Sequence, residues 1–448
     1  MTGSTTPSEL DRRMTPARTL IFAIAAGMAV GNLYWAQPLI EVIASSLDVT
    51  SSSAATLVTV TQVGYALGIF LIVPLGDILD RRRLIPLILT VSAVALLGAA
   101  LAPSFAVLLA ALGGVGLTTV GAQLLAPLAS ELAEPERRGR VVGAIASGTL
   151  IGILLSRTIS GFVADLLGWR AIYVIAAVAA LVLAAVLRAV IPPLDPREPL
   201  PYPRLLGSVF TTVAQHRAVL PTLAICAASF AVFSMFWTSL TYLLTAPPFS
   251  FSVSQIGLFG LAGLAGALAA RRAGALHDRG WSVPATGLAL AVLALSLGAA
   301  WAGSNSVIAL VVAVIALDIA AQSILVLGQT RLFAMPGSAH SRLNTAFVVS
   351  NFLGGALGSA IGGPLWSAGG WAAIMTASLA ITLTGLTVWT LTRRRLAHTS
   401  PITAAVEKPT AKRLTHARQT HSQPGRSRHA PPSTEATQKA NAPRPPHP

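Results

Sequence analysis

The chain has 448 residues, of which 54% are hydrophobic and only 10% are charged, and its mean hydropathy is +0.70. Soluble domains carry about 25% charged residues, so this composition excludes a soluble globular protein and indicates one embedded in a membrane. The net charge of +15 does not indicate nucleic-acid binding, because the segment from Arg393 to Pro448 alone holds eleven Lys or Arg against two acidic residues.

Twelve apolar segments, each long enough to cross a hydrocarbon core of about 30 Å, follow one another along the chain. The first six span residues 20–45, 54–79, 84–102, 104–133, 141–166 and 170–190. After a Pro-rich, charged stretch, the other six span residues 218–246, 253–271, 283–303, 305–333, 343–367 and 371–392. Because a helix satisfies its own backbone hydrogen bonds in lipid, the sequence predicts an all-α membrane protein with 12 transmembrane helices.

Basic residues mark alternate loops, and this predicts how the chain lies in the bilayer. Arg81, Arg137, Arg279 and Arg393 come from four loops of one set, whereas the intervening loops are nearly uncharged. The positive-inside rule therefore predicts a multi-pass protein of the cell (inner) membrane with both termini cytoplasmic. We expect a cytoplasmic N-terminal segment (1–19), a six-helix bundle (20–190), a cytoplasmic linker (191–217), a second six-helix bundle (218–392) and a basic, disordered cytoplasmic tail (393–448).

The two halves of the chain repeat one another at an offset close to 200 residues. Four pairs of segments match in order: Gly76 to Arg81 with Gly274 to Arg279, Ala122-Gln123 with Ala321-Gln322, Arg140 with Arg342, and Gly168-Trp169 with Gly370-Trp371. An even number of helices in each half makes the repeats parallel. Transporters with such symmetry bind their substrate near the middle of the bilayer, between the two halves.

Two motifs resemble those of a known family. The Gly-x-x-x-Asp-Arg loops are similar to motif A of the major facilitator superfamily, which lies between helices 2 and 3 and again between helices 8 and 9. The segment from Asn32 to Leu39 resembles a helix 1 segment of bacterial drug, sugar and nucleoside efflux proteins of the drug:proton antiporter type. The resemblance covers about residues 18–392. It implies two pseudo-symmetric six-helix bundles that transport by alternating access as a monomer.

The chain departs from the antiporter pattern in two helices. The stretch Gly113-Gly114-Val115-Gly116 has no arginine where such antiporters carry one in helix 4. In helix 5, Ser156-Arg157-Thr158 stands in place of the proline region of motif C. Any proton coupling must therefore rest on other residues.

The motif A loops predict a cytoplasmic gate. Asp80 can face the positive end of a neighbouring helix, which we expect to be the start of helix 11. Arg81 can pair with a carboxylate at the end of helix 4, where Glu131 and Glu134 are at the right depth. The alternative is that these arginines only determine topology. The expected gate residues are Gly76, Asp80, Arg81, Glu131, Gly274, Asp278 and Arg279.

Asp318 is the candidate for proton coupling. It lies about 13 residues into helix 10, which at about 1.5 Å per residue places it about 20 Å deep, close to the bilayer middle. An acid there costs about 2.5–3.5 kcal/mol on insertion scales, so we expect it to face the central cavity. The second half has no Lys or Arg at this depth, which suits Asp318 to bind and release a proton. A hydrogen-bonded structural acid is the alternative.

Arg157 is a second intramembrane charge, on helix 5 towards the outer side. Glu41, near the outer end of helix 1, has a similar depth and is its expected partner in an intramembrane ion pair. Arg157 can equally contact an anionic group of a substrate.

In this fold helices 1, 4, 7 and 10 line the central cavity, and they carry a few polar and aromatic residues. Such walls suit a small organic solute better than an inorganic ion. The expected cavity residues are Asn32, Tyr34, Gln37, Thr119, Gln123, Trp237 and Gln322.

We therefore predict a secondary active transporter that exports a small organic compound (a drug, sugar, nucleoside or metabolite) in exchange for protons. A proton-linked importer and a non-transporting membrane sensor of the same fold are the alternatives. An enzyme is disfavoured, because no nucleophile, base and orienting group converge at one depth. We expect no cofactor and no metal, and the expected partners are the lipid bilayer, the substrate and protons.

Overall fold

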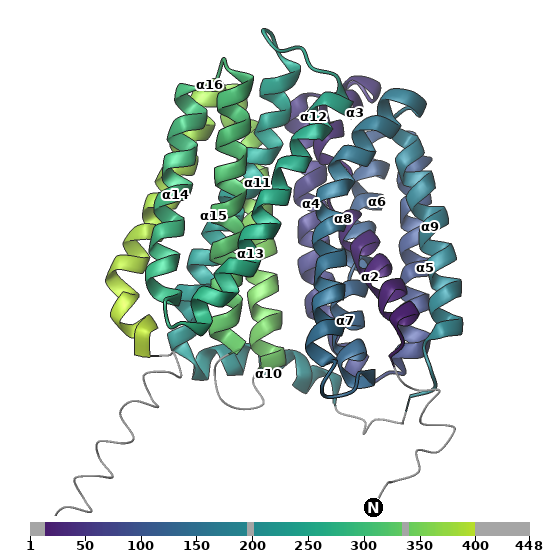
Figure 1. The fold of residues 1–448 in the computed structure, drawn as a ribbon. Coiled ribbons are helices and arrows are strands. Elements are labelled where there is room, and N and C mark those ends of the chain that lie inside the picture. Colours follow the sequence, from purple (N-terminus) through teal and green to yellow (C-terminus); the bar gives the residue numbers. More distant parts are fainter. Residues whose placement is uncertain (1–13, 195–200, 334–339, 399–448) are drawn as a thin grey trace, which may run out of the picture. The chain divides into compact units, whose positions relative to one another are not determined.

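The computed structural model of the chain describes residues 14–194, 201–333 and 340–398, all of which belong to one compact unit, Met1–Pro401. Every regular element in these ranges is helical. Residues 393–398 of the predicted disordered tail are helical, and the rest of that tail, from residue 399, lies outside the described residues. The all-α fold class is thus confirmed. In Figure 1 the helices are coloured along the sequence, from purple near the N-terminus to yellow near the C-terminus.

The first half of the chain contains ten helical elements within the described residues, and some of them join into one span. They are α2 (Pro16–Gly31), η1 (Gln37–Leu39), α3 (Ile40–Ser46), α4 (Ser51–Leu71) with η2 (Val73–Asp77), α5 (Arg81–Ala100), α6 (Phe105–Thr118), α7 (Gly121–Leu132), α8 (Arg138–Leu167) and α9 (Trp169–Val190). Side-chain caps begin several of them: Thr50 accepts from the Ser53 amide at the start of α4, and Asp80 accepts from the Arg82 amide at the start of α5.

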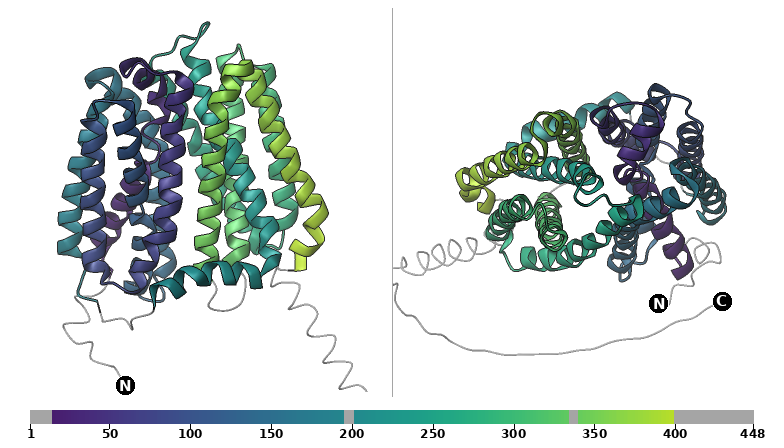
Figure 2. Two further views of the ribbon diagram at one scale, coloured as in Figure 1. Left: turned by 180° about the vertical axis from the view of Figure 1, so that it is seen from behind. Right: turned by 90° about the horizontal axis from the view of Figure 1, so that it is seen from above.

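The second half (residues 218–392) follows a linker helix that the sequence did not predict. The linker helix is α10 (Tyr202–Gln215), and the later elements are η3 (Arg217–Val219), α11 (Leu220–Thr245), α12 (Val253–Leu258), η4 (Phe259–Ala262), α13 (Gly263–Asp278), α14 (Ser282–Ala302), α15 (Val307–Phe333) and α16 (His340–His398). Figure 2 shows α10 lying across one end of the helices rather than alongside them. The Tyr202 hydroxyl donates to the Leu71 carbonyl at 2.6 Å, and Phe210 packs on Phe70.

Within the described ranges, nine segments are long and apolar enough to cross a membrane, and Pro16–Gly31 and Val253–Ala262 are shorter apolar helices. The last of the nine contains α16, which is two helices joined at a kink at Gly369 and Gly370. Ten of the twelve predicted segments match these elements to within a few residues, whereas the segment 20–45 is broken after Gly31 and the segment 253–271 is divided between α12, η4 and α13. The count of twelve is reached when the kinked helix is counted as two spans and both shorter helices are included.

The sequence repeat corresponds to repeated backbone geometry. Gly168 separates α8 from α9 with φ of 84°, and Gly370 lies in the α16 kink with φ of 56°. Side chains disfavour this left-handed region, so glycine suits both turns. The tryptophan that follows each glycine, Trp169 or Trp371, is buried.

Helices approach closely at equivalent glycines in the two halves. A Cβ on Gly152 of α8 would overlap the backbone of Gly27 on α2, and a Cβ on Gly354 of α16 would overlap Ala227 on α11. Small residues of this kind let helix backbones pack tightly in a membrane.

The halves meet through α4, α11 and α16. The Gln62 amide donates to the Ser234 hydroxyl at 2.7 Å, and the hydroxyls of Thr59 and Ser359 are 2.9 Å apart. The Tyr242 hydroxyl also donates to the Ser51 carbonyl at 2.9 Å. These bonds join residues that lie about 170 to 300 positions apart in the chain, so they hold the halves together.

Candidate functional site

Asp318 lies within α15, and its side chain is only 3% exposed. Its Oδ1 accepts a hydrogen bond of 3.2 Å from the indole Nε1 of Trp237 on α11. Glycines of α13 pack against the same residue: a Cβ on Gly263 would lie 2.9 Å from Asp318 Oδ2, and one on Gly266 would lie 3.0 Å from the Asp318 carbonyl oxygen. The carboxyl group is thus enclosed by α11 and α13.

Arg157 lies on α8 and is 2% exposed. Its Nε donates to Gln37 Oε1 at 2.8 Å. Aromatic rings surround its guanidinium: Cζ lies 4.3 Å from the Trp237 ring centroid, 4.8 Å from that of Tyr34 and 5.6 Å from that of Phe233. Such contacts between a cation and ring faces stabilise a buried charge, by about 2 kcal/mol when water is absent.

The expected ion pair between Arg157 and Glu41 is not formed. Arg157 bonds Gln37 instead, and Glu41 Oε2 accepts from the Ser51 hydroxyl at 2.9 Å. The reason is that residues 32–39 are turn and 3-10 structure rather than α-helix, so depths measured along an unbroken helix 1 are wrong beyond Gly31. Gln37, four residues before Glu41, therefore occupies the position beside Arg157.

Asp318 and Arg157 meet at Trp237. Its Nε1 contacts the carboxylate and its ring face covers the guanidinium, and the two charges interact electrostatically. They are not an ion pair, because the ion pairs of the described residues include neither. The sequence analysis found no Lys or Arg at the depth of Asp318 in the second half of the chain. The basic residue near Asp318 is Arg157, which belongs to the first half.

Three of the expected cavity residues, Tyr34, Gln37 and Trp237, gather at this site with Asp318. Among the described residues, the other four make no hydrogen bond to this group. Asn32 accepts from Trp35 Nε1 at 2.8 Å, and Gln123 Nε2 contacts the Tyr65 hydroxyl at 3.5 Å. Thr119 is buried at the break between α6 and α7, and Gln322 is half-buried on α15. Phe233 joins this group. Helix 7 was expected to offer it to the cavity, although a Phe there was expected rather to face lipid or a neighbouring helix, and its spacing of four residues from Trp237 places both on one helix face.

Motif A forms a compact cluster in the first half. Arg81 is buried and donates to three acceptors: the Gly76 carbonyl at 2.8 Å, Glu131 Oε1 at 2.9 Å and Asp77 Oδ1 at 3.1 Å. The structure thus places Glu131, one of the two expected acids, against Arg81. This contact ties the start of α5 to α7.

Asp80 contacts the helix that follows it, and its expected position facing the start of helix 11 stays a prediction. Its Oδ1 accepts from the Arg82 amide at 2.9 Å, so it caps α5, the helix that it directly precedes. In the second copy of the motif, Gly274 has open space around it and Arg279 is exposed. The side chain of Asp278 lies outside the described residues.

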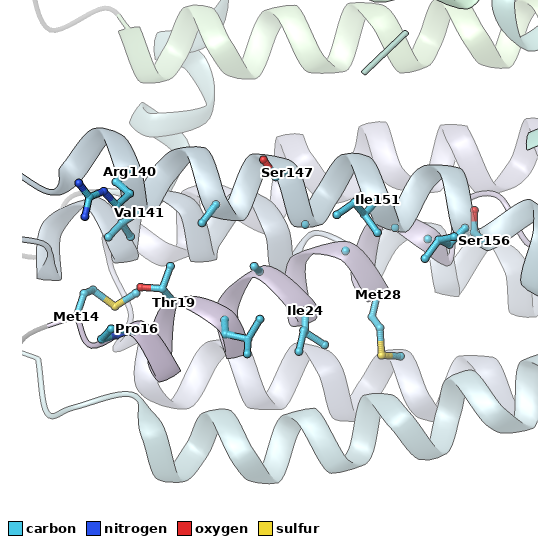
Figure 3. A pocket seen from close by; sticks show the side chains of 18 of the residues that line it. Met14, Pro16, Thr19, Ile24, Met28, Arg140, Val141, Ser147, Ile151 and Ser156 are labelled. Atoms are coloured by element: carbon cyan, nitrogen blue, oxygen red, sulfur yellow. The ribbon is translucent and has the colours of Figure 1, made fainter. Parts of the chain in front are cut away.

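A groove of about 720 Å³ runs between α2 and α8, apart from the site at Trp237. Figure 3 shows Arg140 near one end of it and Ser156 near the other. Its exposed side chains include Leu20, Ile24 and Ile151, as expected for a surface that faces lipid. Among the described residues, no three His, Cys, Asp or Glu side chains gather as a metal site.

Comparison with known proteins agrees with this architecture. The sequence profile of the Major Facilitator Superfamily matches residues 20–334. The "Uncharacterized transporter YgaY" of Escherichia coli O157:H7 is 42% identical over 379 residues, which cover 85% of this chain and 96% of the relative. The "Probable transporter SCO4007" of Streptomyces coelicolor is 34% identical over 376 residues, 84% of this chain and 86% of the relative.

Solved structures show the same fold. A bacterial homolog of the human lysosomal transporter Spinster, in an inward-facing and occupied conformation, has a TM-score of 0.70. It is 15% identical in sequence and covers 89% of this chain and 99% of its own. With the matches of profile and sequence, this shows a multi-pass membrane transporter, and the chain belongs to the major facilitator superfamily.

Proposed function

We propose that this transporter couples the movement of a small organic compound to the movement of protons, with Asp318 as the proton-binding group. The observation that carries the proposal is the position of Asp318: it is buried on α15, bonded to Trp237 of α11, and close to Arg157 of the other half. We also propose the cell membrane as its location, with both termini on the cytoplasmic side, because the basic loops alternate along the chain.

The energetic argument supports a functional role for this acid. Burying a carboxylic acid at this depth costs about 2.5–3.5 kcal/mol, so such acids are rare unless they act in transport. Asp318 also lies where the two halves meet, and this is the place whose access to water changes when the halves rock. A proton-binding group needs that change of access in order to load on one side and unload on the other.

Export in exchange for protons is the direction that resemblance to efflux proteins supports. In that mechanism the substrate and the proton compete for Asp318, so only one of them is bound at a time. The inward proton gradient then drives the substrate out.

Proton-linked uptake is the second candidate, and Arg157 is the observation that favours it. An ionised Asp318 offsets the charge of Arg157, whereas a protonated Asp318 leaves that charge free to attract a substrate. Proton and substrate would then bind together and move in the same direction.

The test of coupling is transport by the purified full chain in proteoliposomes, with a panel of labelled drugs, sugars, nucleosides and carboxylates. We expect Asp318→Asn to lose flux driven by a pH gradient while keeping counterflow, the exchange of labelled for unlabelled substrate. Undiminished gradient-driven flux in Asp318→Asn would refute the assignment of Asp318.

A matched control is available in Asp48→Asn. Asp48 is exposed and has a backbone φ of 51°, a conformation that asparagine also tolerates. Its flux should equal that of the parent protein. If no member of the panel shows counterflow with the parent protein, transport of these compound classes is refuted and the sensor alternative is favoured.

We further propose that the Arg81 cluster closes the cytoplasmic side between transport steps. The supporting observation is that one buried guanidinium joins α5, η2 and α7 through three hydrogen bonds. Such a cluster must be rearranged if these helix ends separate during rocking.

A further inference from the structure

We propose that the substrate is an organic carboxylate, whose carboxylate binds Arg157 and Gln37 and whose apolar body lies against the rings of Tyr34, Phe233 and Trp237. This inference deepens the second candidate function, proton-linked uptake, by naming the class of its substrate, and it rests on that function only for transport and coupling.

Two hydrogen-bond donors of the site have no acceptor among the described residues. Within those residues Arg157 Nη2 and Gln37 Nε2 are both buried and both without a partner, and their residues are 2% and 1% exposed. They are neighbours, because Arg157 Nε donates to the oxygen of the same Gln37 amide. A buried donor without an acceptor costs about 1–3 kcal/mol, so each of these groups favours a ligand that supplies an acceptor.

The charge of the site favours an anion over a neutral acceptor. Arg157 keeps its proton at all relevant pH values, and within the described part of the chain it has no ion pair. Asp318 interacts with it at longer range and is itself bonded to Trp237. A carboxylate has two oxygens, so it can accept from Nη2 and from the Gln37 amide together while it neutralises the guanidinium.

The walls of the site favour an organic ligand rather than an inorganic anion. The guanidinium is covered by the rings of Tyr34, Phe233 and Trp237. Phe233 continues into a stack with Phe230, whose ring centroid is 5.6 Å away, and Phe230 packs on Phe352. A hydrated inorganic anion would lose its water against these rings without gaining apolar contact, whereas an apolar body gains about 25 cal/mol for each Å² that it buries.

Anion binding must be linked to the charge of Asp318. The charged and titratable groups around the pair are Arg157 on α8, Tyr34 in the turn after α2 and Tyr65 on α4, while α11 contributes Trp237 and α13 contributes glycines. A carboxylate beside Arg157 is repelled by an ionised Asp318 and not by a protonated one. By linkage, each of the two ligands raises the affinity for the other, so the carboxylate should bind more tightly at lower pH.

The test measures binding to the purified full chain by ligand-dependent thermal stabilisation. The probes are benzoate, phenylacetate and hexanoate, each compared with its neutral amide. We expect at least one carboxylate to stabilise the protein and its amide to have little effect. Arg157→Gln should weaken the affinity for that carboxylate about tenfold or more, since it removes a charged hydrogen bond. Equal stabilisation by acid and amide, or no stabilisation by any of the acids, would overturn the proposal.

A second variant keeps the test decisive if Arg157→Gln does not fold. Gln37→Glu supplies a carboxylate to Arg157 from within the protein, so it should fold, melt at a higher temperature without ligand, and no longer respond to the acids. If the Gln37→Glu variant binds the acids with unchanged affinity, the proposal that they bind at Arg157 and Gln37 is contradicted. Asp318→Asn tests the carboxylate site and the proton-binding role of Asp318 together. If this variant still binds the carboxylate but its affinity no longer depends on pH, both proposals are supported. Carboxylate binding without any proton coupling in the parent protein would refute the proposed coupling and leave the carboxylate site intact.

Discussion

Asp318 and Arg157 contact different parts of one indole: Trp237 Nε1 donates to Asp318 Oδ1 at 3.2 Å, while Arg157 Cζ lies 4.3 Å from the ring centroid of Trp237. Arg157 belongs to α8 in the first half, and the other two residues belong to α11 and α15 in the second half. Trp237 therefore links the two intramembrane charges across the boundary that must move in alternating access.

Substitution of Trp237 should separate its two contacts. Trp237→Phe keeps a ring over Arg157 but removes the donor to Asp318, and a hydrogen bond to a charged group contributes about 1.5–3 kcal/mol. We expect about a tenfold lower initial rate of transport. Trp237→Leu loses both contacts and should be slower still. Initial rates in proteoliposomes at matched protein content test this order, and parental rates in both variants would contradict it.

The Arg81 cluster should not accept a lysine. Arg81 serves three acceptors on separate groups, whereas an ammonium lacks the planar fork that reaches them together. We expect Arg81→Lys to transport nearly as poorly as Arg81→Ala. A double-mutant cycle with Glu131→Ala should show a coupling energy of about 0.5–3 kcal/mol in stability.

Arg83→Ala is the control for that cluster. Arg83 is exposed, and its Nε is 3.9 Å from Asp80, so its loss should change stability by no more than about 0.5 kcal/mol. Equal effects at Arg81 and Arg83 would show that both arginines act only through their charge.

Two glycines of α8 should respond oppositely to alanine. A Cβ on Gly152 would overlap the backbone of Gly27, whereas a Cβ on Gly143 meets no atom within 4 Å. Gly152→Ala should therefore lower the melting temperature, because overpacking costs about 1–3 kcal/mol. Gly143→Ala should be neutral or stabilise by about 0.5–1 kcal/mol. Thermal unfolding in detergent tests the pair, and a stable Gly152→Ala would contradict the close α2–α8 contact.

The contact of Thr59 with Ser359 predicts a cross-link that stops transport. Their hydroxyls are 2.9 Å apart and lie on opposite halves, so the two side chains point toward one another, as those of two cysteines in a disulfide must. In a Cys226→Ala background, which removes the chain's single cysteine, Thr59→Cys with Ser359→Cys should cross-link under oxidation. Flux should fall and return with reductant. A complete cross-link with normal flux would show that the halves need not separate here.

Much of the fold follows from local sequence, and most of the site's contacts do not. Apolar length predicts the spans, and the Gly-Trp repeat predicts two equivalent turns, since both depend on nearby residues. The position of Asp318 inside a long apolar helix could be predicted for the same reason. The bond of Arg157 to Gln37 could not, because the break after Gly31 changes the register of helix 1. Asp80 was assigned to a distant helix although capping the next one is the local solution.

The linker helix α10 was missed for a related reason. The Pro-rich, charged stretch 191–217 was interpreted only as a linker, and its helix is stabilised by contacts such as that of Phe210 with Phe70, which the sequence does not show. The meeting of Asp318 with Arg157 likewise joins residues 161 positions apart, and it depends on how the two halves pack.

The central claim, that Asp318 carries the proton, is tested most directly by proton movement itself. A pH-sensitive dye enclosed in proteoliposomes reports whether a gradient of a transported substrate drives protons across the membrane. With the parent protein we expect a substrate-dependent pH change, whose sign distinguishes uptake with protons from exchange for them. Asp318→Asn should show counterflow but no pH change. A pH change of the same size in Asp318→Asn would contradict the account.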